Sequence, residues 1–551
     1  FGASTDWFEE VTRKNPISQY YNVAFSGGAK SLGYRASLSY QNDQGLLDKT
    51  SNNKLRAKMS INQRNFDDRL SIDYNLTYSK GKSELADNSI LQQVARRNPT
   101  EPVYDQEGIT PISGGYYYNP GPFQYFNPVA MVNESTREKE MRDVMGSMKA
   151  SFEIIEGLKA SVMGSITQSS SNTGSYFGRY YPKDFGTNGS AEIKKSSSTN
   201  SLLEASVDYR KAFKDHTIQA IAGYSYNKGE YEENWSRNYL YDTDYFSYHN
   251  IGAGAALTQG KAGMSSYKDE NKLIAFFGRV MYNYQERYLL SASVRYEGSS
   301  RFGANNKWGT FPAISAGWRI NKEHFMEDIK WINDLKLRVG YGVTGNQEIG
   351  NYKSLQLLEK DRFFYYKENW ISTYKPASNP NPDLKWETSE QYNVGIDLGF
   401  FDQRLTITAD AYLKTTKDLL QQIALPYASG YTTMWINNGK IENKGIELTI
   451  EGTPVAKKHW NWTIGGNISF AKNTIKELGI APSDFGMIKS VSGYWGENVG
   501  NGNDNKFPAN AFLVGHSIGL FVGYQTAGIM QEEEYYSVEN QKKPLKLANS
   551  K

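Results

Sequence analysis

Leu70–Ser79 reads LSIDYNLTYS and decides the fold class. Every second side chain is apolar or aromatic, and the side chains between them are Ser, Asp, Asn or Thr. The stretch RLTITADAYLK at Arg404–Lys414 alternates in the same way over most of its length. A side-chain period of two, with β-branched and aromatic residues on one phase, predicts strands that have one apolar face.

The same period predicts about sixteen strands along the chain. They cover residues 20–27, 33–41, 54–63, 69–79, 142–155, 157–170, 200–211, 216–230, 271–285, 287–298, 311–321, 333–345, 388–401, 404–415, 440–453 and 459–472. One helix is expected at Asp87–Arg97, where three apolar side chains share a face. The fold class predicted is therefore all-β.

The connections between these strands alternate between short and long. Short ones fall at 28–32, 64–68, 156, 212–215, 286, 402–403 and 454–458, and long ones at 42–53, 80–141, 171–199, 231–270, 346–388 and 416–439. This rhythm is typical of a transmembrane antiparallel up-and-down β-barrel, with short periplasmic turns and long extracellular loops. β-sandwich or β-solenoid domains also alternate, but they require linkers, crossings or a fixed repeat, which we do not find.

Composition excludes several other classes of protein. The 551 residues include 62 Lys and Arg against 59 Asp and Glu, a net charge of +3, and no cysteine. The near balance of charge argues against a nucleic-acid binder, and the absence of cysteine excludes disulfide scaffolds and Cys-ligated metals. No apolar run approaches the ~18 residues of a transmembrane helix. Barrel strands remain possible because they expose every second side chain to lipid.

The sequence contains no convincing catalytic or metal site. GHSIG at Gly515–Gly519 resembles a nucleophile elbow around Ser517, but no histidine follows and no helix is expected after it. GYGVTG at Gly340–Gly345 lacks the helix that a dinucleotide site requires. The five histidines are scattered, so the prediction is a protein that is not an enzyme and has no metal or cofactor.

Aromatic residues are concentrated in the long loops, in the stretches Gly114–Phe126, Tyr231–His249 and Asp361–Tyr374. Clustered Tyr and Trp can stack on sugars, clamp peptides or form protein interfaces. The alternative is that the loops pack on one another. The residues predicted to contact a substrate or a covering partner are Tyr116, Tyr117, Tyr118, Tyr125, Trp235, Tyr239, Tyr241, Trp370 and Trp495.

The strand pattern also predicts on which face of the sheet each side chain lies. The apolar phase should contact lipid and the polar phase should line the lumen. In the strand at 404–415 this places Ile407 toward lipid and Thr408 toward the lumen.

Several long stretches resemble one family. The segment RYEGSSRFGANNKWGTFPAISAGWRINKEHFMEDIKWINDLKLRVGYGVTGNQEIGN, Arg295–Asn351, is similar to the barrel of SusC/RagA-type TonB-dependent transporters of Bacteroidetes. Further stretches with this resemblance are Asn381–Leu420, Asn437–Val455, Ile518–Gln531 and Ser4–Gly28. The resemblance covers nearly the whole chain.

The resemblance implies a bacterial outer-membrane barrel that imports oligosaccharides or peptides. It implies a SusD-like surface lipoprotein as a lid, a plug, energy from the TonB complex, and contact with membrane lipid and lipopolysaccharide. A non-energised porin, a surface adhesion barrel and a soluble glycan-binding protein are the alternatives. A TonB box and plug are not recognisable here, so gating residues are not assigned.

Because short and long loops alternate between the two sides of the membrane, the number of strands predicts on which side each end of the sheet lies. Residues 1–551 are expected to form one barrel domain that is incomplete at both ends, with edge strands at Tyr20–Gly27 and His459–Lys472. Large plugged transporters have about 22 strands, and an even number returns both ends to the periplasm. Residues 473–551 are then expected to form an extracellular excursion.

Overall fold

The computed structural model describes residues 2–105, 113–119, 125–184, 186–431, 433–479, 493–495 and 510–521. The chain divides into two compact units. Unit 1 consists of Phe1–Val280 and Arg295–Arg301, and unit 2 consists of Met281–Val294 and Phe302–Lys551. Each unit is described by itself below.

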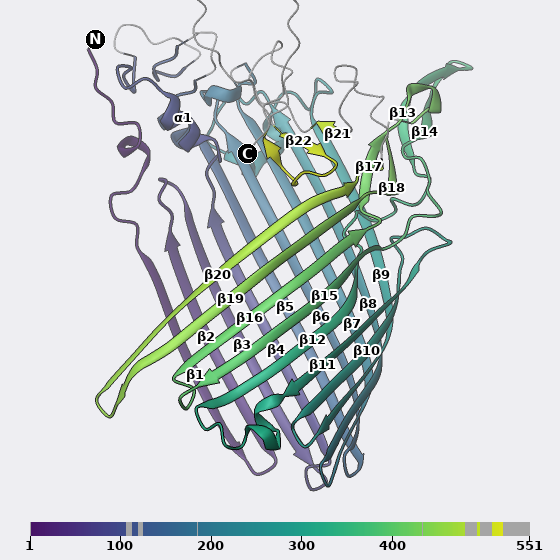
Figure 1. Ribbon diagram of the computed structural model, residues 1–551. Coiled ribbons are helices and arrows are strands. Elements are labelled where there is room, and N and C mark those ends of the chain that lie inside the picture. Colours follow the sequence, from purple (N-terminus) through teal and green to yellow (C-terminus); the bar gives the residue numbers. More distant parts are fainter. Residues whose placement is uncertain are drawn as a thin grey trace, which may run out of the picture. The chain divides into compact units, whose positions relative to one another are not determined.

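One antiparallel sheet of sixteen strands dominates the structure, in the order β1-β2-β3-β4-β5-β6-β7-β8-β9-β10-β11-β12-β15-β16-β19-β20 (Figure 1). In unit 1 the strands are β1 (Ser18–Ala29), β2 (Leu32–Gln44), β3 (Ser51–Asn65), β4 (Leu70–Glu84), β5 (Ser135–Ile155), β6 (Leu158–Phe177), β7 (Ser190–Phe213) and β8 (His216–Tyr239). Residues of β9 (Gly263–Tyr284) and β10 (Tyr288–Ser299) belong to both units. In unit 2 they are β11 (Trp308–Arg319), β12 (Ile332–Asn346), β15 (Glu387–Phe400), β16 (Leu405–Lys417), β19 (Lys440–Lys457) and β20 (Trp460–Glu477).

Smaller elements lie in the connections. The helices are α1 (Ile90–Arg96), α2 (Pro128–Asn133) and the short 3₁₀ turns η1 (Glu9–Val11), η2 (Pro182–Asp184), η3 (Ser247–Ala253), η4 (Ile320–Lys322), η5 (His324–Met326) and η6 (Tyr427–Ser429). The remaining strands are β13 (Leu358–Tyr366), β14 (Asn369–Pro376), β17 (Leu420–Ala424), β18 (Thr433–Asn437), β21 (Gly493–Trp495), β22 (Asn510–Leu513) and β23 (Leu520–Phe521). They form separate small sheets, β13-β14, β17-β18 and β21-β22-β23.

The predicted strands are confirmed, since each of the sixteen ranges falls on one strand of the large sheet. The helix expected at Asp87–Arg97 is also present, as α1. Several strands are longer than predicted at the end that leads to a long loop. β7, for example, begins at Ser190 and not near residue 200. Its first ten residues include five serine, threonine or asparagine residues and show no apolar phase, but they continue the ladder with β6 and β8.

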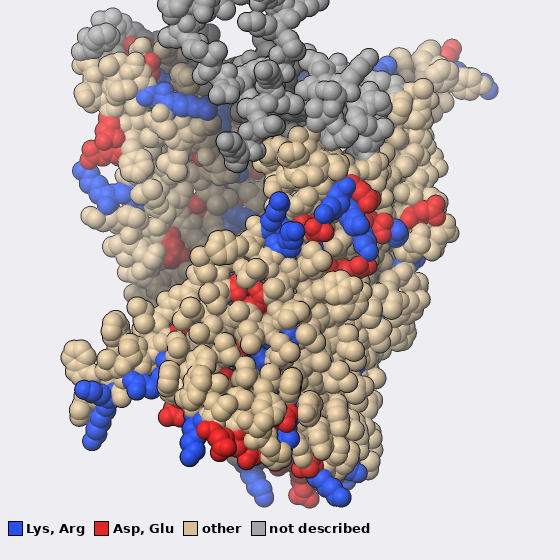
Figure 2. All heavy atoms as spheres, viewed as in Figure 1, with Lys and Arg blue, Asp and Glu red and all other residues tan. Residues whose placement is uncertain are grey.

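The two faces of the sheet differ as the period of two predicts. In unit 1 the hydroxyl of Ser79 donates a hydrogen bond to the carboxylate of Asp143 at 2.9 Å, across β4 and β5. Their neighbours Tyr78 and Val144 are also cross-strand partners, and they are 40% and 37% exposed. In unit 2, the strand surface in Figure 2 is mostly uncharged at mid-length, and charged side chains gather toward the strand ends.

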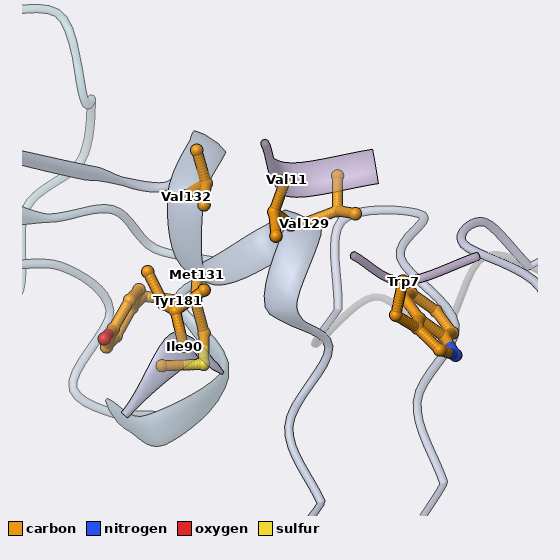
Figure 3. Close-up of a cluster of buried hydrophobic side chains, with 7 residues drawn as sticks. All are labelled: Trp7, Val11, Ile90, Val129, Met131, Val132 and Tyr181. Carbon is orange, nitrogen blue, oxygen red and sulfur yellow. The ribbon is translucent and has the colours of Figure 1, made fainter. Parts of the chain in front are cut away.

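Unit 1 has a hydrophobic core among its connections. It consists of Trp7, Val11, Ile90, Val129, Met131, Val132 and Tyr181 (Figure 3). These side chains come from the N-terminal segment, α1, α2 and the β6–β7 connection. Asn127 begins α2 by accepting hydrogen bonds from the backbone N–H groups of Val129 and Ala130. The core therefore holds loops that are far apart in the sequence in one fixed arrangement.

The strand order has two ends, β1 and β20. Among the described residues, β1 pairs with β2 and β20 pairs with β19, and neither has a second partner. The two ranges predicted as edge strands, Tyr20–Gly27 and His459–Lys472, fall on the first and last strands of this order, and an open sheet at these two strands stays a prediction. Most of residues 473–551 lie outside the described residues, so the expected extracellular excursion stays a prediction.

Candidate ligand-binding loops

The aromatic residues predicted to bind a ligand lie on the long-loop ends of both units. Unit 1 carries Tyr116, Tyr117, Tyr118, Tyr125, Trp235, Tyr239 and Tyr241, and unit 2 carries Trp370 and Trp495. Trp495 lies in β21, where it pairs with Ala511 of β22.

Arg97 organises the loop that contains Tyr117 and Tyr125. Its guanidinium donates hydrogen bonds to the backbone carbonyls of Tyr125 at 2.6 Å and Tyr117 at 3.2 Å. The same group lies 5.2 Å from the ring centre of Trp7 and is paired with Glu101 at 2.8 Å. The side chain of Arg97 is only 1% exposed. One buried cation thus fixes the backbone here, while the rings of Tyr118 and Tyr125 remain 41% and 40% exposed.

Tyr116 joins this loop to the start of β5. Its ring stacks on Tyr104 with centroids 5.5 Å apart, and its hydroxyl donates to Glu134 Oε1 at 3.4 Å. Burial raises the pKa of the Glu134 carboxyl, and the nearby charge of Asp244 raises it further. Glu134 thus connects Tyr116 to the start of β5.

Asp244 ties the β6–β7 and β8–β9 connections together. Its Oδ1 accepts from the hydroxyl of Tyr176 at 2.7 Å, and its Oδ2 accepts from Nε of Arg179 at 3.0 Å. The ring of Tyr241 packs edge-on against Tyr176, with centroids 5.6 Å apart. Tyr241 is 1% exposed and donates to the carbonyl of Ile251 at 3.0 Å, and burial raises its pKa to about 12. In this structure Tyr241 packs the loops together and presents no ring surface to solvent.

Trp235 and Tyr239 lie near the end of β8. The guanidinium of Arg237 lies 5.9 Å from the ring centre of Trp235, and it donates to the hydroxyl of Tyr239 at 3.3 Å. Arg237 is also held by Glu192 on β7. Both aromatic side chains are half-buried.

Trp370 lies on an exposed aromatic surface of unit 2, the β13–β14 hairpin. It is 69% exposed and lies opposite Tyr365 in the ladder, with ring centroids 5.1 Å apart. Four further aromatic side chains of this hairpin are between 51% and 67% exposed, namely Phe363, Phe364, Tyr366 and Tyr374. The sequence prediction did not select these four, although they lie in a stretch whose aromatic density is evident.

On the polar face of unit 2, three strands share one charged cluster. The guanidinium of Arg338 on β12 forms hydrogen bonds to Asp397 on β15 and to Asp410 on β16, at 2.8–3.0 Å. The hydroxyl of Thr408 lies 3.3 Å from Asp397 Oδ1, which places it on the same face. Ile407 belongs to the opposite face, where its ladder partners are Leu398 and Ile450. The polar and apolar phases therefore separate as predicted.

The catalytic-looking motif GHSIG forms a turn beside the end of β20. Gly515 and Gly519 have φ values of +87° and +76°, which favour glycine. The hydroxyl of Ser517 donates to the backbone carbonyl of Asn473 at 3.2 Å. In the described ranges, no group of three or more His, Asp or Glu side chains is placed to hold a metal ion. Nor does any helix there have the length and apolar character needed to cross a bilayer.

Comparison with known proteins agrees with this architecture. Residues 2–538 match the family model described as TonB dependent receptor-like, beta-barrel. The chain is 30% identical to the TonB-dependent receptor SusC of Bacteroides thetaiotaomicron over 553 residues, which covers 95% of this chain and 52% of SusC. It is 28% identical to the TonB-dependent receptor P3 of Formosa agariphila, covering 96% of this chain and 51% of that protein. The chain spans about half the length of these curated relatives.

The solved structure of the RagAB peptide transporter shares the fold. It superposes with a TM-score of 0.76 at 22% identity, covering 93% of this chain and 55% of the other. The resemblance to SusC/RagA-type barrels is confirmed by these relatives, and proteins of this kind reside in the bacterial outer membrane. The chain belongs to the TonB-dependent receptor-like β-barrel family.

Proposed function

We propose that this chain is the barrel wall, with its ligand-binding loops, of an outer-membrane importer that works with a SusD-like lipoprotein and draws energy from TonB. The observation that carries the proposal is the β13–β14 hairpin. It extends from the connection between β12 and β15, one of the long loops, and exposes aromatic rings along both strands. Soluble proteins rarely expose such clusters without a binding role.

The substrate class proposed is an oligosaccharide or a peptide. Aromatic faces stack on sugar rings and pack against peptide side chains, and the similar RagAB is described as a peptide transporter. Two cations of the hairpin lie over rings, since Lys360 Nζ is 4.5 Å from the ring centre of Phe363 and Lys367 Nζ is 5.4 Å from that of Tyr366. These cations provide positive charge for an acidic group on either ligand.

The proposal is tested by replacing Trp370, Tyr366 and Tyr374 with alanine in the complete protein. Binding of the lipoprotein encoded beside it and TonB-dependent uptake of candidate oligosaccharides and peptides are then measured. We expect loss of lipoprotein binding, of uptake, or of both. The control is Lys375→Ala, which breaks the exposed pairs with Glu359 and Asp361 on the same hairpin and removes no ring. Unchanged binding and uptake in the aromatic variant would contradict the proposal.

We also propose that β1 and β20 pair with further strands of the complete protein. All twelve residues of β1 are exposed, and unpaired strand edges are not tolerated in lipid. Mass spectrometry of the native polypeptide tests this proposal. A mass near 62.3 kDa, or cross-linking that shows β1 and β20 paired with each other, would contradict it.

A further inference from the structure

The part of β8 that leads into the β8–β9 connection carries aromatic rings at a regular interval. Tyr231, Trp235 and Tyr239 are four residues apart, so they share one face of the strand at a spacing of about 13 Å. Tyr267 of β9 lies beside Tyr231 with ring centroids 6.4 Å apart, and its hydroxyl donates to Asp269 at 2.6 Å. Tyr231, Trp235, Tyr239 and Tyr267, which all belong to unit 1, are called the aromatic ladder below.

The strand register places the aromatic ladder on the polar face of the sheet. Direct cross-strand partners point to the same face. Asp143, which accepts a hydrogen bond from Ser79 on the polar face, is the partner of Ser169 on β6. Ser169 is in turn the partner of Ser198 on β7, and Ser198 is the partner of Tyr231. Because the polar face of a barrel wall lines the lumen, the ladder lies along the pathway of the importer proposed above.

The ring of Trp235 lies against the start of β9. Two of its atoms are 3.1 and 3.2 Å from the position that a Cβ atom would have on Gly263. The φ of Gly263 is not positive, so it is the closeness of the ring, and not the backbone conformation, that disfavours a larger side chain there. The guanidinium of Arg237 lies 5.9 Å from the centre of the same ring. The ring is therefore held in place before a ligand arrives, which lowers the entropy cost of binding.

The charged side chains that alternate with the rings on β8 are neutralised in pairs. Glu233 is paired with Lys194 of β7 at 2.9 Å, and Arg237 is paired with Glu192 of the same strand. Both pairs lie on the polar face and join β7 to β8. A charged ligand would have to break one of these pairs to gain a counter-ion, whereas an uncharged ligand leaves both intact.

A patch of hydroxyl and amide side chains adjoins the aromatic ladder. Three successive cross-strand pairs of β6 and β7 on the polar face contain only serine, threonine and asparagine, namely Thr167–Asn200, Ser169–Ser198 and Ser171–Ser196. These six residues are called the hydroxyl patch below. A hydroxyl group both donates and accepts hydrogen bonds, whether it belongs to serine, threonine or a sugar. The wall therefore presents aromatic rings and uncharged hydrogen-bonding groups side by side.

We propose that the aromatic ladder and the hydroxyl patch bind a run of neutral sugars in an oligosaccharide. The inference rests on the proposed function and narrows its substrate from an oligosaccharide or a peptide to a sugar chain. The sugars stack their apolar faces on the rings and exchange hydrogen bonds with the hydroxyl patch. Because successive rings of β8 are about 13 Å apart, they contact separate sugars of an extended chain and not adjacent ones. The paired charges disfavour uronic acids and charged peptides, which gain no counter-ion here.

The test measures the affinity of the complete protein for neutral hexasaccharides of glucan, xylan and mannan, for hexagalacturonate, and for acidic and basic hexapeptides. The ladder variant replaces Tyr231, Trp235 and Tyr239 with leucine, which keeps apolar bulk on the strand and removes the rings. We expect a neutral hexasaccharide to bind wild type and the ladder variant to lose tenfold or more of that affinity. The control replaces Tyr224 and Tyr226, which lie on the opposite face of β8, with leucine and should keep wild-type affinity.

A second variant is expected to change selectivity without removing a ring. Glu192→Gln together with Glu233→Gln leaves Arg237 and Lys194 without their carboxylate partners. This variant should bind hexagalacturonate several times more tightly than wild type does and should keep the affinity for the neutral hexasaccharide. A role of the two ion pairs in strand packing alone would not produce that gain.

Assembly of every variant is checked by heat modifiability on SDS gels. The single replacement Trp235→Leu is made alongside, so the ladder is tested even if the triple variant does not assemble. Wild-type affinity in the assembled ladder variants, tighter binding of hexagalacturonate or a peptide than of every neutral hexasaccharide by wild type, or no gain in the second variant would overturn the inference. TonB-dependent uptake is measured in parallel. Its absence in wild type would contradict the proposed function, and the measured affinities would still decide the role of the ladder.

Discussion

The guanidinium of Arg338 holds both carboxylate oxygens of Asp397, with Nε–Oδ2 and Nη2–Oδ1 distances of 2.8 and 2.9 Å. The same group holds Asp410 on the next strand. Replacing Arg338 with methionine leaves two partly buried carboxylates facing each other. We expect the free energy of unfolding, measured with urea in lipid vesicles, to fall by about 1–3 kcal/mol.

A matched variant separates charge from packing at this cluster. Arg338→Met combined with Asp397→Asn and Asp410→Asn removes the repulsion, and it should recover most of the lost stability. If Arg338→Met alone is as stable as wild type, the cluster does not contribute to stability in the way its geometry indicates.

The face assignment of β16 predicts different results for two neighbouring positions. Arginine at a lipid-facing position near mid-membrane destabilises a barrel by about 2–4 kcal/mol, whereas changes on the lumen side mainly alter selectivity. We therefore expect Ile407→Arg to impair assembly far more than Thr408→Arg, measured as the fraction of protein that is heat-modifiable on SDS gels. Equal assembly of the two variants would show that the phase assignment is wrong.

The aromatic residues near the loop ends are tested as a set. Alanine at Trp235, Tyr239, Trp370 and Trp495 should weaken lipoprotein docking or substrate binding, since an aromatic pair contributes about 0.5–1.5 kcal/mol beyond the area it buries. Both affinities are measured by titration with the purified partner and ligand. Tyr241→Phe is the control, because Tyr241 is buried and keeps its packing as phenylalanine. Unchanged affinities in the fourfold variant would count against a binding role.

Asp87 makes the loop core of unit 1 sensitive to acid. Burial alone would raise the pKa of its carboxyl, but hydrogen bonds from Lys183, Ser89 and Tyr181 bring it below its ordinary value of 3.8. A folded-state pKa below the unfolded one means that the stabilisation is present at neutral pH and is lost as the pH falls below about 4. We expect Asp87→Asn to accelerate hydrogen exchange of the α1 amides at neutral pH.

The control for this prediction is the neighbouring Asp184. Burial raises the pKa of the Asp184 carboxyl, so its charge does not stabilise the folded state at neutral pH. Asp184→Asn should leave the exchange of α1 unchanged or slow it. Faster exchange in both variants would indicate a general loosening of the loops and not the loss of the Asp87 hydrogen bonds.

The turn between β5 and β6 depends on one glycine. Gly157 has a φ of +80°, and a Cβ atom there would lie 2.2 Å from the carbonyl oxygen of Arg210. Gly157→Ala should therefore destabilise the barrel by at least the ~1–2 kcal/mol that a left-handed backbone costs an L-residue, measured by urea unfolding. Gly164→Ala, with open space at its Cβ position, is the matched control and should be close to neutral.

Much of the fold could be predicted from the sequence because the period of two repeats in every strand that has one apolar face. The polar ends of the strands could not be predicted from the sequence. Stretches such as Ser196–Asn200 have no alternating apolar residues, and they form strand only because they pair with the neighbouring strands. The helix α2 was missed because six residues are too few for a helical period. The sequence feature that indicates α2 is the Asn127-Pro128 pair, in which asparagine caps the helix and proline occupies its first position.

The candidate site was predictable only in part. Aromatic density identified the loops, but the exposure of each ring depends on contacts between loops that are distant in sequence. Tyr241 is covered because Asp244 binds Tyr176 and Arg179, which lie 68 and 65 residues away. Trp370 is exposed because its hairpin pairs with itself and not with the large sheet.

The length of β7 and β8 determines how far the loop ends lie from the apolar part of the strands. The last clearly apolar outward residue of β7 is Leu203, and the ladder continues from Ser201 to Ser190 without an apolar phase. These twelve residues span about 40 Å along the strand. At physiological ionic strength the Debye length is only about 8 Å. In the importer proposed above, the field of the anionic headgroups would therefore be screened before it reaches the loop ends, and the loops would bind acidic or basic ligands independently of the charge of the surrounding membrane.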